Sequence, residues 1–220
     1  MKHEQTIEDQ LTNLLLSQKI TPERFKLPLT FDVAATYIRA AVRAEILRRH
    51  RIPIISGEQE RTISLMAQYL TATDRFGLAL IGSVGNGKTT LVRAIQAVID
   101  HLNIEDPYSI RPFALDIRTA VELTRLDDDT YRRYCNTKLL AIDDLGNEPT
   151  EVLSYGNTTY PIIELLTTRY ERQLYTIITT NLTPAQIRDK YGDRIADRLN
   201  EMCHTVTFTY PTFRSAKPTM

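Results

Sequence analysis

The segment from Gly82 to Thr90 constrains this chain more than any other, because it places three glycines before a Lys-Thr-Thr triplet in the order GSVGNGKTT. The apolar run at residues 78–81 before it predicts a buried strand, and residues 91–102 after it predict a helix. A chance glycine-rich turn is the alternative. A strand in front and a helix behind, however, are the context in which phosphate-binding P-loops occur. The sequence therefore predicts a nucleotide site at this turn.

Each residue type in the segment has a chemical use. Glycines let backbone N–H groups turn inward around phosphates, and the amino-terminal end of the following helix favours the same anion. Lys88 would reach the β- and γ-phosphates of ATP, and the Thr89 hydroxyl would ligate Mg²⁺. The expected nucleotide-binding residues are Gly82, Ser83, Val84, Gly85, Asn86, Gly87, Lys88, Thr89 and Thr90.

Two consecutive acids end a second apolar run. Residues 139–142 predict a buried strand that delivers Asp143 and Asp144 to its carboxyl end, where ligands bind in open α/β sheets. Asp143 is suited to the magnesium shell together with Thr89, and Asp144 to orienting or deprotonating the attacking water. Alone, the pair could be a turn or a helix cap. The P-loop upstream favours the catalytic interpretation.

Polar residues further along complete the expected catalytic set. The strand expected at 175–179 is followed closely by Asn181, whose amide could hold the attacking water or the γ-phosphate, although Asn also commonly ends a strand. Arg194 and Arg198 are four residues apart and share a helix face. They either pair with neighbouring acids or present a guanidinium to a phosphate in the same or a neighbouring subunit.

Composition narrows the class of protein. Of the 220 residues, 42% are hydrophobic and 25% charged, which is typical of a folded, water-soluble chain. Lys plus Arg and Asp plus Glu both number 27, so any DNA contact needs a local basic patch. Cys135 and Cys203 have no metal-ligand spacing and indicate plain thiols. No run has the length of a membrane span, so we expect a cytoplasmic protein.

The first 56 residues contain no glycine and differ in this from the rest of the chain. Helical spacing predicts two apolar stripes there, the first formed by Ile7, Leu11, Leu14 and Leu15 and the second by Val33, Tyr37, Ile38 and Ala41. The stripes fit an internal core and a partner-docking surface equally well. Thr21 and Pro22 resemble a helix start. The basic run Arg48 to Arg51 is expected to be a solvated helix end.

From Gly57 onward, helical stretches alternate with strands expected at 78–81, 110–114, 139–142, 175–179 and 205–208. This alternation predicts a parallel sheet with crossover helices. Thr183, Pro184 and Gln186 predict a capping box that starts a helix. We expect a helical N-terminal domain at 1–56, an α/β nucleotide-binding domain at 57–214 and a tail at 215–220.

Together, the four motifs resemble the AAA+ ATPases of the DnaC-like helicase-loader and IstB-like transposition-helper group. The resemblance covers about residues 57–214 and rests on the order of GSVGNGKTT, IDDLG, TTNL and GDRIADR. It implies a three-layer α/β sandwich with a central parallel five-stranded sheet and no clear C-terminal lid. It also implies that Asn181 is the sensor-one residue, Arg198 the arginine finger and Arg194 the second choice for that role.

Further details follow from the resemblance. Many members have Glu where Asp144 stands, and the shorter side chain favours slow hydrolysis and a switch over a motor. Arg214 is the candidate for a sensor-two residue, and the adenine pocket is expected around Ile52 and Pro53. ATP and Mg²⁺ are the expected cofactors, with subunits associating through their ATP sites.

The leading functional hypothesis is a loader that places a replicative helicase on single-stranded DNA, with the N-terminal residues contacting the helicase. DNA would be contacted at phosphates by candidates such as Arg118, Arg125, Arg132 and Arg133, although ordinary surface charge is the more common explanation of such arginines. A transposition helper that assembles on duplex DNA and recruits a transposase is the alternative. A metabolite kinase, which shares the P-loop, and a non-hydrolysing scaffold are further alternatives. The kinase is not favoured, because the remaining motifs are of the kind that senses nucleotide.

Overall fold

The computed structural model of the chain describes residues 6–17, 24–154 and 157–210. The described helices are α1 (Ile7–Ser17), α2 (Phe31–Arg48), α3 (Gly57–Thr71), α4 (Lys88–Leu102), α5 (Ala120–Leu123), α6 (Asp128–Asn136), α7 (Pro161–Glu171), α8 (Pro184–Tyr191) and α9 (Asp193–Met202). The described strands are β1 (Gly77–Gly82), β2 (Leu115–Thr119), β3 (Leu139–Leu145), β4 (Val152–Ser154), β5 (Asn157–Thr159), β6 (Tyr175–Thr180) and β7 (Cys203–Phe208).

Five strands form one sheet in the order β2-β3-β6-β1-β7, and every neighbouring pair is parallel. The central strands β1, β3 and β6 consist almost entirely of buried residues, as expected for a parallel sheet covered on both faces. Strands β4 and β5 form a separate antiparallel hairpin. The predicted parallel five-stranded sheet is confirmed.

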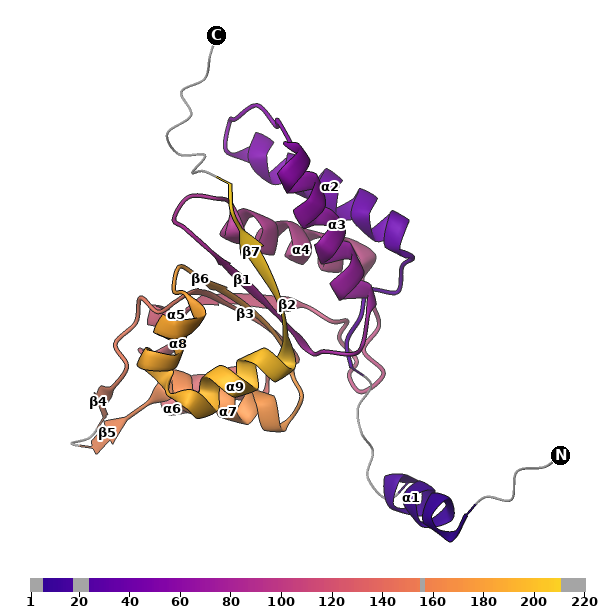
Figure 1. Cartoon of the computed structure of the whole chain (residues 1–220), viewed down its shortest axis with the longest axis vertical. Helices are drawn as coiled ribbons and strands as arrows, with labels where there is room; N and C mark the ends of the chain where they lie inside the picture. The colour runs from indigo at the N-terminus through magenta and orange to yellow at the C-terminus, as the bar shows by residue number, and fades with distance from the viewer. Residues whose placement is uncertain (1–5, 18–23, 155–156, 211–220) are drawn as a thin grey trace, which may run out of the picture.

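Helices cover both faces of this sheet and complete a three-layer sandwich (Figure 1). Helices α2, α3 and α4 lie on one side, and α5 to α9 lie on the other. The predicted capping box at Thr183 is present at the start of α8, where the Thr183 side chain accepts from the Gln186 N–H and the Gln186 side chain accepts in return. The predicted fold class is therefore confirmed.

One predicted strand is wrong. Residues 110–114 form no strand; pairing with β3 begins only at Leu115, opposite Leu139. Pro112 lacks the N–H that a sheet ladder requires, and the Ile110 side chain is fully exposed. The strand that does form, β2, alternates apolar and charged residues at the sheet edge, so its run of apolar residues is too short to reveal it.

Helix α2 belongs to the core of the molecule. It packs against α3 and α4, and Ala34, Ile38 and Val42 are buried in the same hydrophobic core as the sheet residues. The internal-core interpretation thus applies to this helix, with a buried stripe slightly offset from the predicted one, because Val33 is exposed. The division of the chain at residue 56 stays a prediction.

The remaining expectations concern residues near the two ends of the chain. Helix α1 forms where the first apolar stripe predicted a helix, and its Ile7 and Leu11 side chains are exposed. Thr21, Pro22 and Arg214 lie outside the described residues. Within the described chain, β7 is followed only by residues up to Tyr210, and none of these is helical.

Candidate nucleotide site

The glycine-rich turn adopts a conformation that its glycines make possible. Gly85 and Gly87 have φ values of 84° and 94°, in the left-handed region that residues with a Cβ rarely adopt. Gly87 is also the N-cap of α4, so the turn leads directly into the helix. A Cβ at Gly82 would lie 2.5 Å from Asn86 Nδ2 and 2.8 Å from the Phe208 carbonyl oxygen. A side chain at Gly82 is therefore excluded by the close packing of this turn against Asn86 and Phe208.

Lys88 is buried at the centre of the site, although it carries a charge. Its Nζ donates to the Gly82 carbonyl oxygen at 2.7 Å, to the Ser83 carbonyl oxygen at 2.9 Å and to Asn181 Oδ1 at 2.9 Å. Burial lowers the pKa of Lys88, and the nearby Asp144 and Asp143 partly counteract this shift. The Lys88 ammonium is thus surrounded by oxygen acceptors. Phosphate oxygens could accept hydrogen bonds from it in the same way.

Asp143 is linked to the first turn of α4. The Thr89 hydroxyl donates to both carboxylate oxygens of Asp143 at 3.0 Å, and the Thr179 hydroxyl donates to Oδ1 at 2.5 Å. A hydroxyl and a carboxylate in contact are the oxygen donors that Mg²⁺ prefers. The two residues predicted to share a metal are thus adjacent, while the described residues contain no cluster of three or more His, Cys, Asp or Glu side chains.

Asp144 has an unusual backbone. Its φ is 56°, a left-handed conformation that Asp tolerates better than most residues. Its N–H donates to the Thr179 hydroxyl at 2.8 Å, and the strand register shifts between Ile142 and Leu145. Within the same strand, Asp144 lines the cavity described next, whereas Asp143 does not.

A cavity of about 1040 Å³ contains these groups. All predicted P-loop residues from Val84 to Thr90 line it, together with Asp144 and Asn181, so the structure brings the separate motifs to one place. Gly82, Ser83 and Asp143 do not line it. Ile52 does, as the expected adenine pocket requires, but Pro53 does not.

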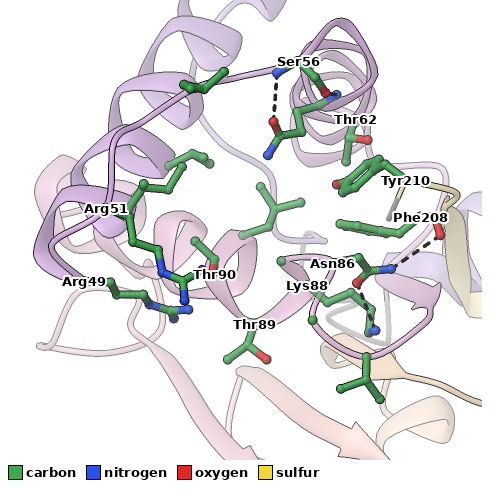
Figure 2. A pocket seen from close by; sticks show the side chains of 18 of the residues that line it. Arg49, Arg51, Ser56, Thr62, Asn86, Lys88, Thr89, Thr90, Phe208 and Tyr210 are labelled. Carbon is green, nitrogen blue, oxygen red and sulfur yellow. Dashed lines mark hydrogen bonds between the residues drawn. The ribbon is translucent and has the colours of Figure 1, made fainter. Parts of the chain in front are cut away.

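Other lining residues were not predicted. Ser56, Gln59 and Thr62 come from the start of α3, and Phe208 and Tyr210 come from the end of β7 and the residues after it (Figure 2). No motif marks them, and they are brought in only by the packing of α3 beside β7. Arg49, His50 and Arg51 also line the cavity, so the basic run ends helix α2 as expected and faces the site as well.

These features fit ATP and Mg²⁺. Gly85 and Gly87 line the cavity in left-handed conformations, the Lys88 ammonium is held among oxygen acceptors, and Thr89 with Asp143 forms a suitable oxygen donor set. The cavity is also large enough for a nucleotide, since ligand pockets are typically ~300–1,000 Å³.

The two candidate finger arginines do not line this cavity. Arg198 is largely covered: its guanidinium lies 4.8 Å from the Tyr170 ring centre, and its Nη2 donates to Glu171 at 3.2 Å. Arg194 is exposed. Neither residue therefore reaches the nucleotide site of its own chain in this structure.

The four arginines considered for DNA binding follow α4 in the sequence. One is on β2, one lies between α5 and α6, and two are on α6. Arg118 and Arg133 both donate to the Tyr134 hydroxyl, at 2.6 and 3.1 Å. Arg125, Arg132 and Arg133 are exposed, and Arg118 is half-buried. Two of the four are therefore engaged with a buried tyrosine, and Arg125 and Arg132 are accessible to solvent without that contact.

The fold and the convergence of the P-loop, the acid pair and Asn181 on one cavity define an AAA+ P-loop ATPase. A family model described as IstB-like ATP binding protein matches residues 44–218. The chain belongs to this IstB-like family.

Solved structures with a similar fold include the DnaC helicase loader, DnaI and DnaA. The match to the crystal structure of the DnaC helicase loader has 22% sequence identity and a TM-score of 0.54. It covers 70% of this chain and 92% of that chain. DnaI is 21% identical, with 79% and 92% covered and a TM-score of 0.57. The replication initiator DnaA bound to AMPPCP and single-stranded DNA is 19% identical, with 72% and 49% covered and a TM-score of 0.51. A search of curated proteins found no match.

None of the described helices has the length and hydrophobicity to cross a membrane.

Proposed function

We propose that this protein hydrolyses ATP and uses the nucleotide as an assembly switch. The observation that carries the proposal is the contact of Lys88 Nζ with Asn181 Oδ1 at 2.9 Å, because it joins the phosphate-binding turn to the polar end of β6. Lys88 and the backbone N–H groups of the turn would hold the phosphates, with Mg²⁺ bound by Thr89 and Asp143. The metal would neutralise phosphate charge.

Hydrolysis requires a residue that orients water. Asp144 and Asn181 line the same cavity, and we assign Asp144 the role of orienting or deprotonating the attacking water and Asn181 that of positioning it at the γ-phosphate. Arg198 or Arg194 would stabilise the transition-state charge from a neighbouring subunit, since neither lines the cavity of its own chain. The active form is then an oligomer joined through its ATP sites.

For the biological role, we propose loading of a replicative helicase onto single-stranded DNA. The DnaC helicase loader shares this fold, and another protein with this fold, the replication initiator DnaA, has a solved structure bound to AMPPCP and single-stranded DNA. The exposed apolar side chains Ile7 and Leu11 on α1 supply a surface for the helicase, and Arg125 and Arg132 supply accessible charge for DNA phosphates.

A second role has its own observation in support. The family model that matches the chain is that of IstB-like ATP-binding proteins, and we therefore retain a transposition helper that assembles on duplex DNA and recruits a transposase as the alternative. Both roles use the same ATP switch and differ in the form of DNA that ATP-bound protein selects.

Fluorescence anisotropy separates the two roles. Labelled single-stranded and duplex DNA are titrated with protein, with and without a non-hydrolysable ATP analogue, across a salt series. ATP-dependent preference for single strands supports the loader, and preference for duplex supports the helper. If neither DNA binds under any condition, both roles fail and a non-DNA ATPase or scaffold remains.

A further inference from the structure

The basic run at the end of α2 divides between two environments. Arg48 pairs with Glu45 of the preceding helical turn and does not line the cavity. Arg49, His50 and Arg51 do line it. Figure 2 shows the guanidinium groups of Arg49 and Arg51 directed into the cavity on the side of Thr90, with Thr89 between them and Lys88 in this view.

The backbone explains why these side chains turn toward the site. The His50 N–H donates to the Leu47 carbonyl oxygen at 2.8 Å, and the Arg51 N–H donates to the Ile46 carbonyl oxygen at 3.3 Å. His50 itself has a φ of 54°. This is the hydrogen-bond pattern of a Schellman motif, which ends a helix and reverses the chain. The reversal directs residues 49–51 across the start of α4 instead of along the axis of α2.

The positive charge of Arg49 and Arg51 makes their side of the cavity attractive to a polyanion. Among the described residues that line the cavity, the permanent cations are Arg49, Arg51 and Lys88, and Asp144 is the one carboxylate. The chain as a whole has no net charge, so the excess of positive charge is local to the site. A cleft lined by one sign of charge concentrates ligands of the opposite sign.

We propose that Arg49 and Arg51 bind the polyphosphate chain of the nucleotide in the same subunit. This inference rests on the proposed nucleotide site and adds a second cationic wall, contributed by the segment between α2 and α3, to the one formed by Lys88. Arginine suits the role because its planar guanidinium donates two parallel hydrogen bonds to phosphate oxygens. Nucleotide binding would thereby fasten the end of α2 to the start of α4.

The test measures binding instead of turnover. Isothermal titration is performed with adenosine, AMP, ADP and ATP on the full chain and on Arg49→Gln, Arg51→Gln and the double variant. We expect the double variant to bind ATP at least roughly tenfold more weakly, because charge-assisted hydrogen bonds are lost, and to bind adenosine as the wild type does. The loss should grow with each phosphate present.

Two further variants sharpen the result. Arg43→Gln removes an exposed arginine from the same helix that does not line the cavity, and it should leave every affinity unchanged. Arg49→Lys with Arg51→Lys retains the charge and should recover part of the ATP affinity. Equal ATP binding by the wild type and the double glutamine variant would overturn the inference, as would an equal loss for adenosine and ATP, which indicates a structural defect.

The same titrations distinguish an error in the role of Arg49 and Arg51 from an error in the proposed nucleotide site. If the wild type binds ATP and Lys88→Ala abolishes that binding while the arginine variants have no effect, the nucleotide site stands and only the role of Arg49 and Arg51 is wrong. If the wild type binds no nucleotide, the site and this inference are both wrong.

Discussion

At the scale of single residues, Lys88 is the most sensitive position. Its ammonium is buried and held by oxygen atoms, and it is the side chain best placed to meet the phosphates. We expect Lys88→Ala to abolish the stabilisation that ATP confers, which for the wild type is ~2.7 kcal/mol when ATP is present at 100 times its dissociation constant. Thermal unfolding with and without ATP measures this. The exposed Lys26 provides the control, and Lys26→Ala should retain the full shift.

Substitution of Asp144 is expected to affect ATP hydrolysis without affecting ATP binding. Asn tolerates the left-handed backbone that Asp144 adopts, so Asp144→Asn should fold normally and bind ATP. It cannot accept a proton from water, and loss of a general base typically costs ~10²–10⁴-fold in rate. Single-turnover hydrolysis together with nucleotide affinity tests this prediction. Hydrolysis at the wild-type rate would remove Asp144 from the catalytic set.

Residues far from any motif were beyond prediction from sequence. Arg169 is fully buried, and its guanidinium donates to the carbonyl oxygens of Tyr134, Thr137 and Tyr175; burial lowers its pKa to about 9. Arginine is usually exposed, so no pattern in the sequence indicates this. The P-loop and the acid pair, in contrast, were predictable because local spacing defines them.

At the scale of elements, a buried clamp joins the loop after β3 to α8. The Glu148 side chain accepts from the Gly146 N–H at 2.8 Å and from the Tyr191 hydroxyl, and its carboxylate lies 3.6 Å from Lys190 Nζ. Burial, and then the bond to Glu148, raise the pKa of Tyr191. Tyr191 is followed by Gly192, where the chain turns into α9 with both candidate finger arginines. The clamp thus connects the loop beside the acid pair to the helix that would face a neighbouring subunit.

We expect Glu148→Ala to destabilise the fold by ~1–3 kcal/mol, because it leaves the Tyr191 hydroxyl and the Gly146 N–H without their acceptor. Lys190 keeps the backbone carbonyl oxygens of Gly146 and Glu148. Urea denaturation measures the change. A cycle with Tyr191→Phe provides the control: if the clamp exists, the double variant loses less stability than the sum of the single variants. Additive losses would show that the two side chains do not interact.

The elements also explain why the sequence predicts the residues on one side of the cavity and misses most of those on the other side. Strands β1 and β3 have continuous apolar runs, and β6 has β-branched residues around an Ile-Ile pair. All three were predicted, and with them the P-loop, Asp143, Asp144 and Asn181 at their carboxyl ends. The opposite wall depends on where α2 and α3 pack. Residues such as Gln59 and Tyr210 reach the site only through that packing, which local spacing does not specify.

At the scale of the whole molecule, the position of the two arginines predicts how subunits share a site. Arg198 lies under Tyr170 and is held by Glu171, so Arg198→Ala should reduce stability as well as turnover, whereas Arg194→Ala should leave stability unchanged because its side chain is exposed. Neither should weaken ATP binding, since neither lines the cavity. Denaturation and nucleotide titration of both variants establish these properties first.

Mixing then identifies the finger. A subunit with Lys88→Ala cannot bind ATP but still presents its arginines, and a subunit with Arg198→Ala binds ATP but lacks one arginine. If Arg198 acts on the neighbouring site, mixing two inactive variants restores DNA-stimulated hydrolysis, because one interface in the mixed assembly then combines an intact ATP site with an intact arginine. Rescue with Arg194→Ala but not with Arg198→Ala assigns the role to the exposed residue. If neither mixture recovers activity, the charge at the transition state is stabilised within one subunit, and the shared-site assembly is wrong.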